Sequence, residues 1–309
     1  MEQNKLEEDC DQLYQALKKF MADDETIIRI TMKNNKQKRQ KLKLLYKEKY
    51  FNNLEDDFSK KLSGYFKKTI LALYDNQSDF DAKQINKALK LITNYNTLIE
   101  IICTRENSFL KQIKNSYKKL FNEDLEKPIS NLKNTNLQKL FLLLLKCERH
   151  ENQKNIDENN MKNIAQDFFN FGNGRWINND DYINKIFTEL SPNEFISFSN
   201  FFYEISKNSL RKYLEKEFNK DYQNALITIY ESIACPSEFF AKQINKSIKG
   251  IGTKDKMLIR VLVYREEIDI PQIRIIYKNL IGKELIDDIK GDTHGSYRKI
   301  LMEIASKKY

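Results

Sequence analysis

Apolar residues recur along the chain in four blocks, each of which opens with an amphipathic helix pattern and closes with a strongly apolar one. The closing segments are residues 67–74 (KKTILALY), 137–146 (LQKLFLLLLK), 222–231 (YQNALITIYE) and 297–306 (YRKILMEIAS). The opening segments also resemble one another, with DQLYQALKKF from Asp11, DAKQINKALK from Asp81 and FAKQINKSIK from Phe240. Self-similarity of this kind indicates a repeat architecture, here with units of roughly 70 residues.

A tyrosine lies in a similar helical context in each unit, at Tyr46, Tyr117, Tyr203 and Tyr277. The apolar stripes predict buried positions at Ile27, Ile28, Leu42, Leu45, Ile101, Ile102, Phe141, Leu144, Leu258, Val261, Ile275 and Leu301. Only 8 glycines and 4 prolines occur in 309 residues, and Leu, Ile, Lys and Glu are abundant. Because these residues favour helices and strand-type alternation is scarce, the sequence predicts an all-α fold.

A polar stretch, Glu148–Asn160 (ERHENQKNIDENN), interrupts the spacing between the second and third units. We interpret it as a linker. The predicted organisation is a short N-terminal head at 1–10, a first unit at 11–76, a second at 80–147, the linker at 148–160, a third unit at 161–233 and a fourth at 236–309.

The formal net charge is +9, from 53 Lys and Arg against 44 Asp and Glu. The densest basic run is residues 33–49, and its candidate surface residues are Lys36, Lys38, Arg39, Lys41 and Lys43. Such a run is most simply a solvated helix face. Alternatively it meets anionic lipid headgroups, acidic tails of cytoskeletal polymers or nucleic acid, and the last is the weakest option because no recognition module accompanies the charge.

The most informative segment is residues 249–260 (KGIGTKDKMLIR), which is followed later by residues 290–295 (KGDTHG). Gly250 and Gly252 allow positive φ, so the backbone carbonyls of this loop can turn to one point. Thr253 is a plausible N-cap for the amphipathic helix that follows. A distant carboxylate, Asp292, can complete a ring of oxygens, and oxygen is the ligand that calcium prefers.

This pairing of loop and acid resembles the calcium loop of an annexin repeat, and residues 257–284 keep the annexin pattern almost position for position. The resemblance covers nearly the whole chain from about Asp11. It implies four five-helix units in one curved array with the calcium loops on the convex side. It also implies Ca²⁺ as cofactor, held by the carbonyls of Ile248, Gly250 and Gly252 and by Asp292, with one position left for water or a lipid phosphate oxygen.

The other three units depart from the family pattern. In the first unit, KKFMAD (18–23) replaces the glycine loop and Lys61 stands at the acid position, so we expect no calcium there. The second unit has LKLITNYN (89–96), with no glycine and one residue fewer, and Leu132 at the acid position, so it is also expected to be inactive.

The third unit is intermediate, with the loop GNGRWINNDD (172–181). Here the resemblance implies carbonyl ligands at Gly172, Arg175 and Ile177 and the acid Glu217, although Ile177 replaces the usual glycine and resists positive φ. Trp176, the only tryptophan, is either an interfacial membrane anchor or a core residue.

No nucleophile–base, zinc, P-loop or dinucleotide motif occurs, and the chain has only two histidines, so no enzyme is expected. The four cysteines show no CxxC spacing and are expected to be reduced thiols. No apolar run approaches the ~20 residues that span a bilayer, and no signal peptide is recognisable at the start. We therefore expect a cytoplasmic protein, peripheral at the inner face of the plasma membrane or on the cytoskeleton.

Two functions from different classes are consistent with this pattern. The resemblance implies calcium-dependent binding to acidic phospholipid membranes through the loops of the fourth unit and the third. The eroded loops also resemble those of divergent protist annexins of the alpha-giardin type, which implies a calcium-independent cytoskeletal or flagellar structural adaptor. A weaker alternative is a scaffold that binds sulfated polysaccharide or nucleic acid through charge alone.

Overall fold

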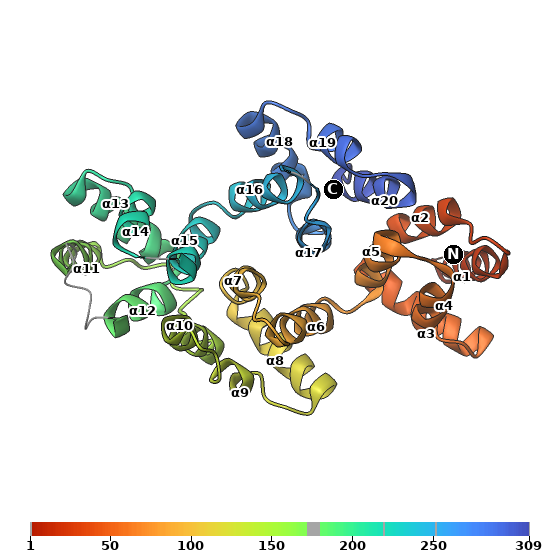
Figure 1. The fold of residues 1–309 in the computed structure, drawn as a ribbon, viewed down its shortest axis with the longest axis horizontal. Coiled ribbons are helices and arrows are strands. Elements are labelled where there is room, and N and C mark those ends of the chain that lie inside the picture. Colours follow the sequence, from red (N-terminus) through yellow and green to blue (C-terminus); the bar gives the residue numbers. More distant parts are fainter. Residues whose placement is uncertain (1, 172–179, 219, 251, 309) are drawn as a thin grey trace. The chain divides into compact units, whose positions relative to one another are not determined.

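The structure is a computed structural model that describes residues 2–171, 180–218, 220–250 and 252–308. Within these ranges the chain forms α-helices and no β-strand, and the helices fall into four consecutive sets of five (Figure 1). Repeat 1 comprises α1 (Glu2–Lys18), α2 (Asp24–Lys33), α3 (Lys36–Tyr50), α4 (Leu54–Lys61) and α5 (Gly64–Tyr74). Repeat 2 comprises α6 (Gln77–Leu89), α7 (Tyr95–Ile102), α8 (Asn107–Phe121), α9 (Glu126–Ile129) and α10 (Thr135–Lys146).

Repeat 3 comprises α11 (Glu158–Phe171), α12 (Asp180–Glu189), α13 (Pro192–Ser206), α14 (Leu210–Glu217) and α15 (Lys220–Ala234). Repeat 4 comprises α16 (Pro236–Ile248), α17 (Asp255–Arg265), α18 (Ile270–Ile281), α19 (Leu285–Asp292) and α20 (Gly295–Ala305). The predicted all-α class and the four repeats of five helices are confirmed. No helix in the described ranges has the length and apolar character needed to cross a membrane.

The chain divides into two compact units. Unit 1 combines Met1–Phe80 with Ser237–Tyr309 and so brings repeats 1 and 4 together, while unit 2 is Asp81–Pro236. In unit 1, α5 packs against α17 and α20, and α2 packs against α20 (Figure 1). In unit 2, α7 and α10 pack against α15, and α11 packs along α13.

The buried side chains follow the predicted apolar stripes with one exception. Of the predicted core positions Leu45 is partly buried and Ile275 is 55% exposed, whereas the others are buried. The prediction for Ile275 was wrong because α18 turns Ile270, Ile273 and Tyr277 inward. Those positions are spaced by three and four residues along one helix face, and Ile275 lies on the other face.

The repeated tyrosines required a correction of register in repeat 3. The third helix of every repeat ends at a residue with left-handed backbone, namely Phe51, Asn122, Lys207 and Gly282. The residue five positions before each of these ends is buried in every repeat, namely Tyr46, Tyr117, Phe202 and Tyr277. Tyr203 is instead 58% exposed, because one residue along a helix turns the side chain by about 100°.

Helix α1 begins at Glu2 and buries Asp9 and Cys10, so packed structure starts before residue 11, where the first unit was expected to begin. Asp9 accepts hydrogen bonds from Lys33 Nζ and Asn34 Nδ2, both at 2.9 Å. All four cysteines are free thiols, and Cys235 is the one that is not buried.

Candidate calcium loops

The loop between the first and second helices is closed by the same backbone hydrogen bond in three repeats. The N–H of Asp23 donates to Ala16 O at 3.1 Å, that of Asn94 to Ala88 O at 2.8 Å and that of Lys254 to Ser247 O at 2.7 Å. The loop of repeat 2 is one residue shorter, as predicted, because its bonded residues Ala88 and Asn94 are one position closer in sequence than Ala16 and Asp23. When the repeats are aligned on this hydrogen bond, the residue of repeat 1 equivalent to Asp81 and Phe240 is Asp9, and not Asp11 as the comparison of opening segments assumed.

The fourth helix positions the acid. Lys61, Glu217 and Asp292 are the last residues of α4, α14 and α19, three helices of 8 residues each. Each is followed by a cap residue whose N–H donates to the carbonyl four residues before it, so the three positions are structurally equivalent. In repeat 2 the helix α9 is only 4 residues long, and Leu132 lies beyond it as a buried residue.

The loop of repeat 4 has the backbone that its glycines predicted. The φ angles of Gly250 and Gly252 are +124° and +83°, a region in which side chains are strained. Among the described residues, no backbone N–H donates to the carbonyls of Ile248, Gly250 or Gly252.

Thr253 connects this loop to the acid. Helix α17 begins at Asp255 with Lys254 as its N-cap, so the expected N-cap role of Thr253 was wrong. Its Oγ1 instead donates to the backbone carbonyl of Asp292 at 3.1 Å. The hydroxyl thus joins the loop to the C-terminal end of α19, a contact that the sequence alone did not reveal.

The residues present fit a hard, oxygen-ligated cation. Asp292 is exposed, and its carboxylate has no hydrogen-bond or ion-pair partner among the described residues. Carboxylate and carbonyl oxygens are the ligands that calcium takes in proteins. The described residues contain no cluster of three or more His, Cys, Asp and Glu that could hold a metal ion, so a cation in repeat 4 would depend on loop carbonyls beside Asp292.

The loop of repeat 1 is built around a different cation. Lys61, at the position equivalent to Asp292, donates its ammonium to the carbonyl of Lys19 at 3.1 Å. Lys19 in turn pairs with Asp23 at 2.6 Å, and Asp23 caps α2 by accepting from the Thr26 N–H at 3.1 Å. The hydrogen bond from Lys19 and, after it, the cap contact with the Thr26 N–H lower the pKa of Asp23 to about 2.

The loops of repeats 2 and 3 complete the set. In repeat 2 Leu91 has a φ of +56°, and Asn94 caps α7 by accepting from the Thr97 N–H at 3.1 Å. The repeat 3 residues predicted as carbonyl ligands or as a membrane anchor lie outside the described residues, namely Gly172, Arg175, Trp176 and Ile177. Glu217 is described, and its side chain is only 6% exposed and lies 3.8 Å from Lys216 Nζ.

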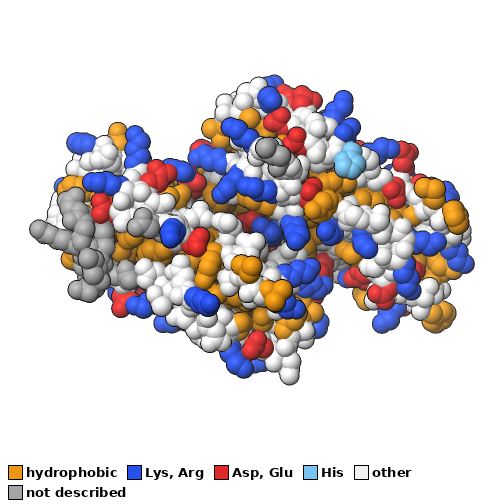
Figure 2. All heavy atoms as spheres, in the orientation of Figure 1, with side chains coloured by type: hydrophobic (Ala, Val, Ile, Leu, Met, Phe, Trp, Pro, Cys, Tyr) orange, Lys and Arg blue, Asp and Glu red, His pale blue; other side chains and the backbone are white. Residues whose placement is uncertain are grey.

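The basic stretch does not form one exposed cationic face. Arg39, predicted to lie on the surface, is fully buried and forms an ion pair with Glu266, so that prediction was wrong. Lys36 and Lys38 are half-buried, and Lys43 is half-buried with contacts to Tyr74 O and Glu55, so Lys41 is the exposed one of the five candidates. Lys33 and Lys49, elsewhere in the stretch, are exposed but pair with Asp9 and Asp11. Figure 2 shows Lys and Arg side chains spread over the visible face, with acidic and hydrophobic side chains among them.

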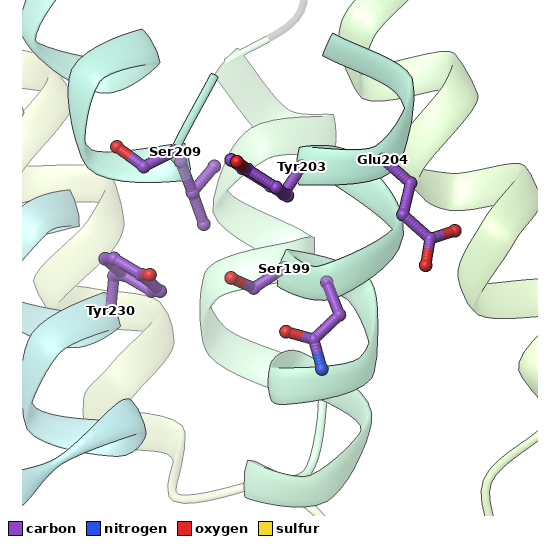
Figure 3. A pocket seen from close by; sticks show the side chains of 7 residues that line it. Ser199, Tyr203, Glu204, Ser209 and Tyr230 are labelled. Carbon is purple, nitrogen blue, oxygen red and sulfur yellow. The ribbon is translucent and has the colours of Figure 1, made fainter. Parts of the chain in front are cut away.

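A shallow pocket of about 430 Å³ lies in unit 2 between α13, the start of α14 and α15. It is lined by Ser199, Asn200, Tyr203, Glu204, Ser209, Leu210 and Tyr230, and Figure 3 shows the Glu204 carboxylate directed away from Tyr230. The lining offers serine and tyrosine hydroxyls and one carboxylate, Glu204, and it includes no His, Cys or Lys.

Comparisons with known proteins agree with this geometry. The family model described as Annexin matches residues 8–73, 80–144 and 239–304, which lie in repeats 1, 2 and 4. The chain is 32% identical to mouse annexin A13 over 297 residues, covering 96% of this chain and 93% of that protein. It is also 32% identical to human annexin A11 over 297 residues, covering 96% of this chain and 59% of that protein.

Solved structures show the same fold. Annexin III superimposes with a TM-score of 0.94 at 28% identity, covering 98% of this chain and 94% of that one. Calcium-bound annexin (Sm)1 gives a TM-score of 0.87 at 24% identity, covering 98% and 91%. Calcium-bound alpha-14 giardin gives 0.86 at 16% identity, covering 98% and 100%, a likeness of fold alone.

Proposed function

Since this chain belongs to the annexin family, we propose that it binds acidic phospholipid membranes peripherally and in a calcium-dependent manner. The proposed ligands in repeat 4 are the carbonyls of Ile248, Gly250 and Gly252 and the carboxylate of Asp292. The observation that carries the proposal is the hydrogen bond of Thr253 to the Asp292 carbonyl, which joins the glycine loop to the acid.

Each residue of the loop has a distinct part in this proposal. Gly250 and Gly252 hold a backbone that other residues would strain, which is the conformation that the proposed carbonyl ligands require. Asp292 contributes the negative charge, and its exposure leaves room for a further oxygen ligand. When Ca²⁺ is bound there, it supplies the positive charge that a lipid phosphate oxygen needs. By linkage, lipid must then raise calcium affinity by the same factor as calcium raises lipid affinity.

A second site is proposed in repeat 3, formed by the carbonyls of Gly172, Arg175 and Ile177 with Glu217. Trp176 would then lie at the membrane interface, where indole side chains are favoured. Because Trp176 is the only tryptophan in the chain, its fluorescence reports on this loop alone. A blue shift on calcium-dependent vesicle binding supports the site, and unchanged emission from bound protein contradicts it.

The experiment is sedimentation with phosphatidylserine-containing vesicles across a calcium titration, with a chelator control. Asp292→Ala is expected to remove most of the calcium-dependent binding, because it takes away the only carboxylate of the site. Asp287→Ala is the matched control, since Asp287 is an exposed acid at the other end of the same helix. Equal calcium dependence in the two variants would contradict the proposal.

The alternative is a calcium-independent cytoskeletal or flagellar adaptor, favoured by the loss of the acid in repeats 1 and 2. It predicts co-sedimentation with microtubules or actin filaments in chelator and no response to phosphatidylserine. Absence of filament binding together with calcium-dependent vesicle binding would exclude it.

A further inference from the structure

The tips of the two loops that lack an acid are apolar and exposed. In repeat 1 Phe20 is 100% exposed and Met21 is 79% exposed. In repeat 2 Leu91 and Ile92 are likewise exposed, at 106% and 89%. Large apolar side chains in adjacent positions at full exposure are unfavourable in water, and adjacent pairs at equivalent loops indicate a surface that they contact.

The loop of repeat 1 lies at the same end of unit 1 as the candidate calcium loop of repeat 4. Helix α2 starts directly after the loop, and its first residue Asp24 accepts a hydrogen bond from Ser296 in the first turn of α20. The ring of Tyr65, in the first turn of α5, lies 5.6 Å from that of Tyr297. The first turns of α2, α5 and α20 therefore meet (Figure 1).

This junction places Lys61 and Asp292 at the same end of unit 1. Helix α5 starts three residues after Lys61, and α20 starts three residues after Asp292. A flat surface that approaches the Asp292 loop can thus also reach Phe20 and Met21. Two protein contacts hold the loop of repeat 1, from Lys61 Nζ to Lys19 O and from Lys19 Nζ to Asp23.

Charge at this tip suits an anionic surface. Lys18, Lys19, Lys60, Lys61 and Lys68 are all exposed in or beside the loop, at the end of α4 or at the start of α5. The start of α2 adds three acids at this end, Asp23, Asp24 and Glu25, of which Asp23 pairs with Lys19 and Glu25 with Lys299. The lysines remain in excess beside the apolar tip, and each basic side chain near an anionic leaflet favours binding at the boundary between headgroups and acyl chains. An anionic bilayer satisfies both the apolar and the basic part of the surface.

We propose that the loop of repeat 1 is a calcium-independent membrane-insertion site. Phe20 and Met21 enter the headgroup–acyl boundary of an anionic bilayer, while the Lys61 ammonium holds the loop where a bound cation would hold its counterpart in repeat 4. The loop of repeat 2, with Leu91 and Ile92, is a second tip of the same kind. The proposal adds a contact with the membrane of the proposed function but does not require the calcium site.

The test is vesicle binding in excess chelator, in both the natural sequence and an Asp292→Ala background. Phe20→Ser/Met21→Ser is expected to weaken binding to phosphatidylserine vesicles by at least about hundredfold, since burying each of the two large apolar side chains corresponds to roughly tenfold to hundredfold. Phe51→Ser is the matched control, because Phe51 is also 91% exposed but lies before α4, at the opposite end of that helix from Lys61. Failure of the calcium site leaves this comparison unaffected.

Insertion is measured separately with Phe20→Trp in a Trp176→Phe background. Its emission is expected to shift to the blue on vesicles in chelator and to be quenched by lipids brominated on the acyl chain. Lys61→Met is expected to speed amide exchange in the loop of the free protein, whereas Lys60→Met, which removes an equal charge, is not.

Four results would overturn the proposal. They are no vesicle binding in chelator, equal binding by the Phe20/Met21 and Phe51 variants, tryptophan emission that stays accessible to aqueous quencher on bound protein, and equal loop exchange in the Lys61 and Lys60 variants. A homodimer in solution that the Phe20/Met21 substitutions dissociate would also overturn it, because the tip would then meet a second copy of the chain.

Discussion

Removing the carboxylate of Glu266 is expected to destabilise unit 1 strongly, because it leaves the buried guanidinium of Arg39 without its counterion. Both side chains are 0% exposed, and they form two hydrogen bonds, from Nη1 to Oε1 at 2.9 Å and from Nη2 to Oε2 at 2.6 Å. Lys307 Nζ adds a third contact to Glu266 at 2.7 Å. Breaking a buried pair by removing one partner typically costs about 3–5 kcal/mol.

After Glu266→Ala, the remaining contacts of Arg39 are long ones, 3.3 Å to Thr31 O and 3.4 Å to Glu267. They replace little of the lost interaction, so the full range of about 3–5 kcal/mol applies to the free energy of unfolding. The double variant Arg39→Met/Glu266→Leu should recover most of it, because an apolar pair of similar volume needs no counterion.

The assay is urea unfolding followed by circular dichroism, with thermal unfolding as a second measurement. Lys242→Ala is the control in the same unit, since its ion pair with Glu238 is 2.8 Å long but both side chains are about 40% exposed. Loss of such an exposed pair costs at most about 1 kcal/mol. A Glu266→Ala variant as stable as Lys242→Ala would refute the reasoning.

Two further predictions concern pH and the glycine loop. Burial alone would raise the pKa of Glu266, but its cationic partners outweigh burial and the pKa is lowered. The Glu266 carboxylate therefore stabilises the fold above its unfolded pKa of about 4.3, and this stabilisation is lost as pH falls through the lower folded pKa. In Glu266→Gln the free energy of unfolding should lose this pH-dependent contribution over the same acid range. Gly252→Val, at a φ of +83°, should raise the calcium concentration for half-maximal vesicle binding by about tenfold, whereas Gly291→Ala, inside α19, should not. Equal midpoints for the two glycine variants would contradict the assigned role of the loop.

The fold and the backbone of the repeat 4 loop could be predicted because apolar periodicity and a glycine pair are local signals, whereas the pairing of that loop with the distant Asp292 came from the resemblance to annexins and stays a prediction. The apolar stripes of each helix and the repeated segments indicated the four repeats, and the pair Gly250 and Gly252 predicted the positive φ angles that the structure has. The loop of repeat 2 was also seen to be one residue shorter when its sequence was compared with the loops of the other repeats. Such features depend on neighbours within one or two helical turns.

The errors arose where residues distant in the sequence determine whether a side chain is buried. The burial of Arg39 depends on Glu266, far away in the sequence, so the run of cations around it read as a surface. In α18 several isoleucines compete for one inward face, and only packing fixes that Ile273 turns inward and Ile275 outward. The sequence showed Lys61 at an acid position, but its contact with the Lys19 carbonyl is a property of the folded loop.

The central claim is that the loop of repeat 4 couples calcium to lipid, and the most direct test measures that coupling. Calcium affinity is measured by calorimetry with and without phosphatidylserine vesicles, and vesicle affinity is measured with and without calcium. We predict that the two affinities rise by the same factor in the natural sequence and that the factor falls towards one in Asp292→Ala. Calcium affinity that is unchanged by vesicles, or a factor that survives in Asp292→Ala, would contradict the account.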